Sequence, residues 1–248
     1  MDSGLYTAYS GLRANADTLD VLSNNLANVN STGFKSDEAF FRLFNHAIAE
    51  SMVVPLDRAI NDSTVVQGTT TNFLPGPLTV TGGELDIALE GEGFFAVEGP
   101  TGTCYTRNGN FHVNAEGQLV NSEGFAVLGR GGRIQLPPGK VSVSQTGDIQ
   151  VNGSRVETLK LVDFSDKRQL EKLGNSLFVF RGPGQAEKES QDLLVRQGSL
   201  EQSNVNPVKQ MMLMINMMRQ FEGLQKTISM MMNTVNDRSI NQIGRSAG

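Results

Sequence analysis

Apolar residues recur at intervals of seven at both ends of this chain of 248 residues, and this repeat limits what the ends can fold into. The N-terminal repeat consists of Leu5, Leu12, Leu19 and Leu26. The C-terminal repeat fills one heptad position with Met211, Met218, Gln225 and Met232 and the other with Met214, Phe221, Ile228 and Val235. Both patterns predict helices with narrow apolar seams, which suit pairing with other helices better than lying flat on a wide core. Asn206 and Pro207 supply a helix cap and a first helical residue for the C-terminal run.

The middle of the chain has a different sequence pattern from the ends. Most of the 27 glycines lie between Gly68 and Gly198, among short runs that alternate apolar and polar residues. The pairs Asn108-Gly109, Glu116-Gly117, Glu123-Gly124 and Asn152-Gly153 read as tight turns between short strands. The sequence therefore predicts an α+β fold, in which a central, mainly antiparallel β domain is flanked by N- and C-terminal α-helices that pair in a coiled-coil-like arrangement.

Five segments follow from these patterns. Residues 1–35 form the N-terminal helix and its turn, 36–84 a linker, 85–197 the β-rich domain, 198–238 the C-terminal helix and 239–248 an unassigned tail. Inside the linker, the spacing of Phe41, Phe44 and Ile48 predicts a further helical turn or two.

Composition excludes several classes of partner. The net charge is −5 and no basic cluster is present, so the electrostatic footprint of nucleic-acid binding is missing. No apolar run reaches the length of a membrane span, and the first residues lack the basic and apolar regions of a cleaved secretory signal. The single cysteine, Cys104, cannot form an internal disulfide.

Candidate chemistry is sparse. Cys104 and His112 stand one hairpin apart, but nothing near them suggests an oxyanion hole or an orienting third group. His46 and Glu50 form half of a metal pair without its second half. The stretch "DIQVNG" imitates the start of a calcium loop, but Leu159 occupies the position of the bidentate glutamate, so a β-hairpin explains it better. We therefore predict no catalytic, cofactor or metal site and no enzymatic activity.

The N-terminal helix is predicted to end in an unusual stretch, "LSNNLANVNSTGFKS", residues 22–36. Asparagine is a poor helix former because its short amide competes for backbone hydrogen bonds. This stretch resembles the signature of the flagellar axial proteins, the family of rod and hook subunits. Two later blocks, "LDIALEGEGFFAVEGPTGTCYTRNGNF" and "QGSLEQSNVNPVKQMMLMI", resemble the central and C-terminal segments of that family. The opening "MDSGLYTAYSGL", the modest length, "NPV" and "RQFE" are most similar to proximal rod members, and distal rod members are the alternative.

The resemblance implies a structural subunit of the flagellar basal-body rod that transmits torque. Implied partners are other rod proteins and further copies of itself, with the flagellar export apparatus during secretion. The implied location is the periplasmic rod, reached without a cleaved signal peptide. The alternative from another functional class is a soluble ligand-binding or enzymatic β domain whose helical ends form a dimer.

The predicted assembly interface combines the two seams with the asparagine-rich turn. It comprises Leu5, Leu12, Leu19, Asn24, Asn25, Leu26, Asn28, Gly33, Phe34, Met211, Met214, Met218, Phe221, Ile228, Met232 and Val235. An amide both donates and accepts, so it suits contacts with unlike neighbours. The alternative reading is that these amides only cap a frayed helix end. Isolated narrow-seam helices are marginal in water, so we expect both ends to be largely disordered until subunits assemble.

Overall fold

The computed structural model describes residues 2–43, 64–100, 102–182, 187–189 and 193–246. The chain divides into two compact units. Unit 1 contains Met1–Leu26, Asp37–Thr70 and Pro207–Gly248, and unit 2 contains Ala27–Ser36 and Thr71–Asn206. Two terminal helices and a mainly antiparallel β region confirm the predicted α+β class. Coiled-coil pairing of the helices stays a prediction.

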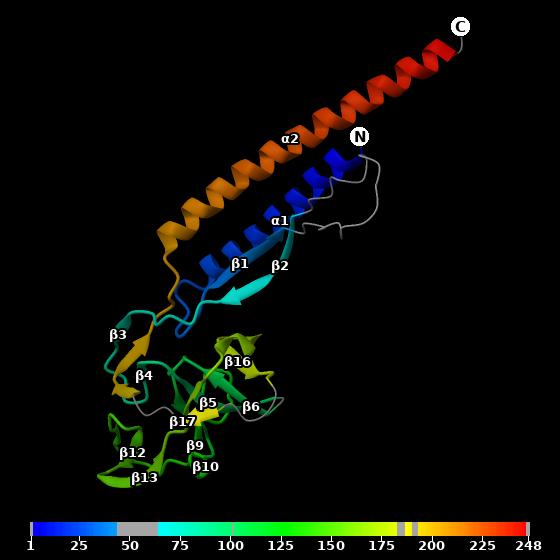
Figure 1. Ribbon diagram of the computed structural model, residues 1–248. Coiled ribbons are helices and arrows are strands. Elements are labelled where there is room, and N and C mark those ends of the chain that lie inside the picture. The colour runs from blue at the N-terminus through cyan, green and yellow to red at the C-terminus, as the bar shows by residue number, and fades with distance from the viewer. Residues whose placement is uncertain (1, 44–63, 101, 183–186, 190–192, 247–248) are drawn as a thin grey trace. The chain divides into compact units, whose positions relative to one another are not determined.

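Unit 1 is built from helices α1 (Asp2–Ala27) and α2 (Pro207–Ser246) and a two-stranded ribbon of β1 (Asp37–Leu43) and β2 (Thr64–Thr71). The helices run side by side in opposite directions (Figure 1). Gly11 of α1 lies against Leu224 of α2, where a Cβ on the glycine would be 3.7 Å from the leucine Cδ1. This is an ordinary van der Waals distance, so the two helices lie next to each other at this position.

The elements of unit 1 extend the sequence prediction at one place and correct it at another. Helix α2 begins at Pro207, as predicted, and continues to Ser246 through most of the unassigned tail. The predicted helical turn after Ser36 is wrong at its start, because Asp37–Leu43 is strand β1. The ring of Phe40 lies over Gly68 of β2, and aromatic side chains favour such a paired strand. Phe44 and Ile48 lie outside the described residues.

In its described residues, unit 2 consists mainly of short strands and includes the 3₁₀ turn η2 (Lys167–Gln169). Its strands are β3 (Leu78–Val80), β4 (Ile87–Glu90), β5 (Phe94–Gly99), β6 (Gly102–Thr106), β7 (His112–Val113), β8 (Leu119–Val120), β9 (Leu128–Gly129), β10 (Gly132–Arg133), β11 (Val141–Val143), β12 (Asp148–Val151), β13 (Ser154–Thr158), β14 (Leu161–Phe164), β15 (Leu170–Gly174), β16 (Leu177–Phe180), β17 (Glu187–Glu189), β18 (Leu194–Gln197) and β19 (Ser199–Glu201). The largest sheet has the order β15-β16-β6-β5-β14-β17, β11-β12-β13 form a second sheet, and the other strands pair in twos.

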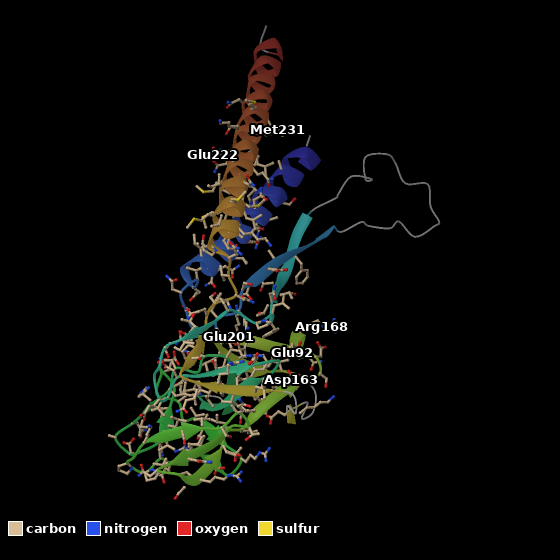
Figure 2. The ribbon with its side chains drawn as sticks, turned by 90° about the vertical axis from the view of Figure 1, so that its left-hand side faces the viewer. Glu92, Asp163, Arg168, Glu201, Glu222 and Met231 are labelled. Carbon is tan, nitrogen blue, oxygen red and sulfur yellow. The ribbon has the colours of Figure 1, made fainter. Side chains whose placement is uncertain are left out.

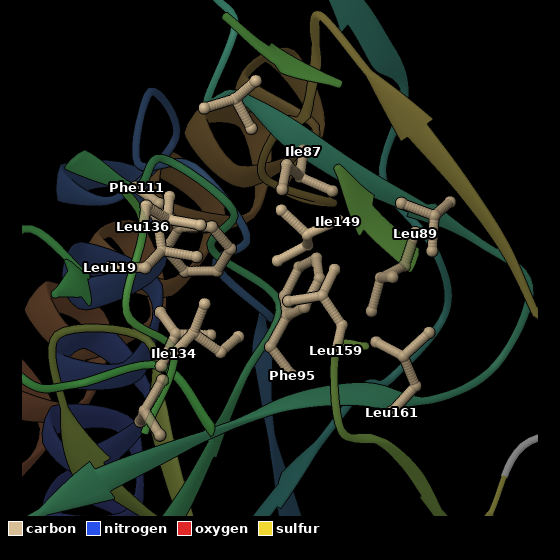
Figure 3. Close-up of a cluster of buried hydrophobic side chains, with 14 of the residues drawn as sticks. Ile87, Leu89, Phe95, Phe111, Leu119, Ile134, Leu136, Ile149, Leu159 and Leu161 are labelled. Atoms are coloured by element: carbon tan, nitrogen blue, oxygen red, sulfur yellow. The ribbon is translucent and has the colours of Figure 1, made fainter. Parts of the chain in front are cut away.

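The central strand β5 is buried on both faces. Phe95 and Val97 belong to the larger apolar cluster, whereas Phe94 and Ala96 belong to a second cluster on the opposite face. Consecutive strand residues point to opposite faces, which explains why "GFFAV" is apolar without interruption. Figure 3 shows Phe95 in the larger cluster beside Leu159 and Ile149. Strand β5 therefore lies in the apolar interior of unit 2.

Three of the four predicted Gly turns form as expected. Gly117 and Gly124 adopt positive φ in turns that close on Asn114 and Asn121, and Asn152-Gly153 joins β12 to β13. The prediction of a hairpin at Asn108-Gly109 is wrong, since β6 pairs with β5 and β16 and not with β7. Gly109 instead passes so close to the Ile87 carbonyl that a Cβ would lie 1.6 Å from its oxygen.

Candidate functional site

Helix α2 carries a half-buried row at helical spacing, which includes Met214, Met217, Phe221, Leu224 and Ile228. This row contains one predicted heptad position, that of Met214, Phe221 and Ile228. The other predicted position faces outward, since Met211, Met218 and Met232 are 51%, 50% and 59% exposed. Val235 lies in α2, but its side chain is outside the described part.

The first turns of α2 are therefore apolar on two sides. Val208, Met212 and Ile215 lie with Met211 and Met218 on the outward side and are 65%, 61% and 52% exposed. Farther along, Arg219, Glu222 and Lys226 occupy that side, and Figure 2 shows Glu222 projecting from the helix. A helix that is apolar all round is normally buried on all sides, so the start of α2 has more apolar surface than one helical partner covers.

Helix α1 is covered unevenly. Leu12, Leu19 and Leu26 of the predicted seam are half-buried, and Leu5 lies in α1 with its side chain outside the described part. The most buried side chains of α1 include Ala14, Leu22 and Asn25 at 4%, 7% and 1% exposure. These three occupy a neighbouring face, which the heptad count missed because two of them are not large apolar residues.

The amide of Asn25 has a definite partner. Its Nδ2 donates to the Asp37 carbonyl at 2.7 Å, and its Oδ1 accepts from the Asp37 N–H at 2.9 Å. The side chain thus pairs with the first residue of β1 as a neighbouring strand would, and only an amide offers both groups at that reach. Asn28 Oδ1 accepts from the Ser31 hydroxyl at 3.1 Å in the turn after α1, and Asn24 is exposed.

The end of the asparagine-rich turn is embedded in unit 2. Gly33 has a φ of +66° and donates its N–H to the Glu201 carbonyl at 2.7 Å. A Cβ at Gly33 would lie 2.4 Å from the Arg107 carbonyl carbon, so no other residue fits without displacement. Phe34 is buried, and the Lys172 ammonium lies 4.4 Å from the centre of its ring. In this chain, therefore, both predicted interface residues contact their own β unit.

Lys35, Arg107 and Glu201 form a buried group that we call the charged triad, and sequence reasoning missed it. The Lys35 Nζ is 2.6 Å from Glu201 Oε1, and the Arg107 Nη1 is 3.1 Å from Glu201 Oε2. None of the three side chains is more than 3% exposed. Figure 2 labels Glu201 among the strands of unit 2. Each of the three residues lies in a different one of the three sequence blocks that resemble the flagellar axial proteins. This was the signal in the sequence that could have pointed to the triad.

The triad has further polar partners. Lys35 donates to the Leu74 carbonyl at 2.9 Å, and Glu201 Oε1 accepts the Gly76 N–H at 2.9 Å. Arg107 donates to the Leu89 and Gly91 carbonyls at 3.3 and 2.6 Å. Burial lowers the pKa of Lys35 from its usual value, and the attraction of Glu201 opposes this shift. The triad thus joins segments far apart in sequence, and a buried pair of this kind tolerates loss of one partner poorly.

Asn204 connects three of the four places where the chain enters or leaves unit 2. Its Oδ1 accepts from the Ser36 N–H at 2.8 Å, and its Nδ2 donates to the Asn72 and Leu74 carbonyls at 2.8 and 3.0 Å. Its own N–H donates to the Phe34 carbonyl at 3.3 Å. The segments ending at residue 36, beginning at 71 and ending at 206 therefore meet at one amide.

The candidates for chemistry do not converge. Cys104 is fully buried in the apolar cluster and burial raises its pKa, whereas His112 is exposed on β7. His46 and Glu50 lie outside the described residues. An open hollow of about 550 Å³ is lined in part by Lys160 and Glu187, which bind each other at 2.8 Å. Within the described ranges, we find no cluster of metal-ligating side chains and no helix both long and apolar enough to span a membrane.

Comparison with known proteins assigns all three blocks to one family. Residues 5–35 match the model for "Flagella basal body rod protein", residues 88–151 that for "Flagellar hook protein FlgE/F/G D1 domain" and residues 196–239 that for "Flagellar basal body rod FlgEFG protein C-terminal". The chain is 36% identical to the flagellar basal-body rod protein FlgF of Caulobacter vibrioides, over 94% of each chain. The chain belongs to the flagellar basal-body rod protein family.

Two further rod proteins refine this assignment. FlgF of Mesorhizobium japonicum is 32% identical over 98% of this chain and 99% of its own length. FlgG of Borreliella burgdorferi is 31% identical over 92% of this chain and 94% of its own length. The family confirms the expected structural subunit of the basal-body rod, and it is not an enzyme family. Of the three relatives, the two FlgF proteins have the higher identities, which favours the proximal assignment over the distal one. Assembly with other basal-body components follows from membership.

Proposed function

We propose that this rod protein is a proximal rod subunit whose paired terminal helices form its assembly surface. The observation that carries the proposal is the start of α2, where apolar side chains lie exposed on the side opposite its half-buried row. In a rod, helices of neighbouring subunits would cover this side. Each large apolar side chain buried there contributes about 1.5–3 kcal/mol before the costs of ordering and association are subtracted.

The turn after α1 has a supporting role in this proposal. Asn25, Gly33 and Phe34 hold the turn to the chain itself, and the exposed side chain of Asn24 adds to the surface that neighbours would meet. The partners we propose are other rod subunits, copies of this chain, and the export apparatus during secretion. The proposed location is the periplasmic rod, reached without cleavage of a signal peptide.

Unassembled chains lack the neighbours that would cover these helices. We therefore expect less helix by circular dichroism of a dilute sample than α1 and α2 would give if fully formed. A dimerising ligand-binding protein would instead show both helices fully formed in a small, fixed oligomer.

Electron microscopy of basal bodies from a strain lacking this protein, beside its parent, tests the proposal. We expect the rod to be missing or to stop near the inner membrane. A rod that ends farther out would favour the distal position. A complete rod with its hook would refute the structural role.

A further inference from the structure

The chain contains two Asn-Gly pairs, Asn108-Gly109 and Asn152-Gly153, and unit 2 places them in opposite surroundings. Asn152 and Gly153 are both exposed, whereas Gly109 is buried and Asn108 is half-buried. Asparagine before glycine is the pair most prone to lose its side-chain amide, because glycine has no side chain to obstruct attack by its own backbone nitrogen. The two pairs therefore share one chemistry and differ in what the fold allows.

The loss of the amide begins when the glycine backbone nitrogen attacks the Cγ of the preceding asparagine. A new N–C bond closes a succinimide ring, the Cγ–Nδ2 bond breaks, and ammonia leaves with the proton of the glycine N–H. Water then opens the ring at either of its two carbonyl groups. The product is aspartate or isoaspartate, and in isoaspartate the main chain runs through the former side-chain Cβ and Cγ.

The exposed pair, Asn152-Gly153, is the two-residue turn between β12 and β13, with φ values of +53° and +83° (Figure 1). A Cβ on Gly153 would meet no atom within 4 Å, so the space around the attacking nitrogen is open. Among the hydrogen bonds of the described residues, none holds the Gly153 N–H. The Lys140 N–H donates to Asn152 Oδ1 at 3.0 Å, where it stabilises the negative charge that attack at Cγ places on this oxygen.

The other pair, Asn108-Gly109, is fixed against β4. The Ile87 N–H donates to the Gly109 carbonyl at 3.0 Å, and a Cβ on Gly109 would lie 1.6 Å from the Ile87 oxygen. Asn108 Oδ1 accepts from the Asn110 N–H at 3.1 Å, so both asparagines have a donor at Oδ1 and this contact does not distinguish them. The difference lies in the glycine, because its nitrogen reaches Cγ only if the peptide between the two residues rotates, and the packing of Gly109 opposes that rotation.

We propose that Asn152 is a site of spontaneous deamidation in the folded subunit, that the fold protects Asn108, and that isoaspartate at residue 152 destabilises unit 2. Isoaspartate adds one carbon to the main chain of a turn whose two residues fix the register of β12 and β13. In that register Val151 pairs with Ser154, and Ile149 and Val151 reach the larger apolar cluster. Because the reaction needs only water, the modified fraction grows with the age of the protein. The site is independent of the proposed assembly role.

Peptide mass mapping of the purified full chain, incubated in mildly alkaline buffer, tests the site. We expect Asn152 to deamidate about tenfold or more faster than Asn108, which corresponds to a barrier lower by about 1.4 kcal/mol. In urea, where neither pair is held, the two rates should become similar. Equal rates in the folded chain, or a faster reaction at Asn108, would overturn the inference. A difference that persists unchanged in urea would also overturn it, since the fold would not be its cause.

Two variants complete the test. Asn152→Gly keeps a turn-forming pair without a side-chain amide, so it should abolish the mass change at this site and leave the reaction of Asn108 unaltered. Freshly prepared Asn152→Asp carries the added charge on an unaltered main chain and is the control for chains that contain isoaspartate, isolated from the aged sample by chromatography. We expect the isoaspartate chains to melt at least about 4 °C below this variant. Equal melting temperatures would overturn the inferred effect on unit 2.

Discussion

Glu201→Gln removes the single negative charge of the charged triad while keeping the shape of the side chain. Glu201 is fully buried and contacts two cations, Lys35 at 2.6 Å and Arg107 at 3.1 Å. The amide can still accept from the Gly76 N–H through its oxygen. Its NH₂ group, however, would face the Arg107 guanidinium, so a donor meets a donor and two buried positive charges lose their counter-charge.

Breaking a buried ion pair by removal of one partner costs about 3–5 kcal/mol. Because Glu201 serves two cations, we expect the upper part of that range. For a unit of this size each kcal/mol lowers the melting temperature by about 2–4 °C, so a loss of about 4–5 kcal/mol should make unit 2 melt about 8–20 °C lower. Urea unfolding of the full chain, followed by near-ultraviolet circular dichroism, measures the free-energy change.

Two further variants sharpen the experiment. Glu90→Gln breaks the exposed pair between Glu90 and Arg196 and should cost less than about 1 kcal/mol. Adding Lys35→Met to Glu201→Gln removes one stranded cation, so the double variant should lose less stability than the sum of the two single variants. A loss from Glu201→Gln no larger than that from Glu90→Gln would refute the reasoning about the triad.

Three other changes probe the turn and the sheet. Gly33→Ala should destabilise unit 2 by about 2–4 kcal/mol in urea unfolding, because its Cβ would lie 2.4 Å from backbone atoms; no change would mean that this contact is not formed. Asn25→Ala should abolish motility without changing the melting of unit 2, because its amide pairs with Asp37 within unit 1; normal motility of this variant would contradict its role. Burial and the Glu187 carboxylate raise the pKa of Tyr105, so the stability it contributes is complete below the unfolded tyrosine pKa of about 10 and is lost as pH rises above it. In spectrophotometric titration, Tyr105 should ionise at higher pH than an ordinary tyrosine, and Tyr105→Phe should remove this late phase. If the phase persists in the variant, it belongs to another group.

The sequence predicted those features that local rules determine. Helix α2 starts at Pro207 because proline suits the first helical turn and is excluded from its interior. The turn at Asn152-Gly153 forms because both residues adopt positive φ readily. The terminal helices and the β-rich middle likewise follow from hydrophobic period and glycine content.

Other features depend on contacts between segments far apart in sequence. The heptad count placed Met218 on a seam, whereas the half-buried row uses Met217, one position away. The triad joins residues 35, 107 and 201, and no local pattern connects charges across such separations. Asn25 was expected at the interface between subunits, but its partner at Asp37 is visible only in the folded chain.

The bonds of Asn204 bear on how such proteins can diverge. Because the segments ending at 36, beginning at 71 and ending at 206 meet at one amide, three of the four points where the chain enters or leaves unit 2 lie together. Insertions with neighbouring ends can be lengthened, shortened or exchanged without altering the parent fold. Evolution could therefore vary the β unit to suit successive positions along an axial structure while the two helices stay unchanged.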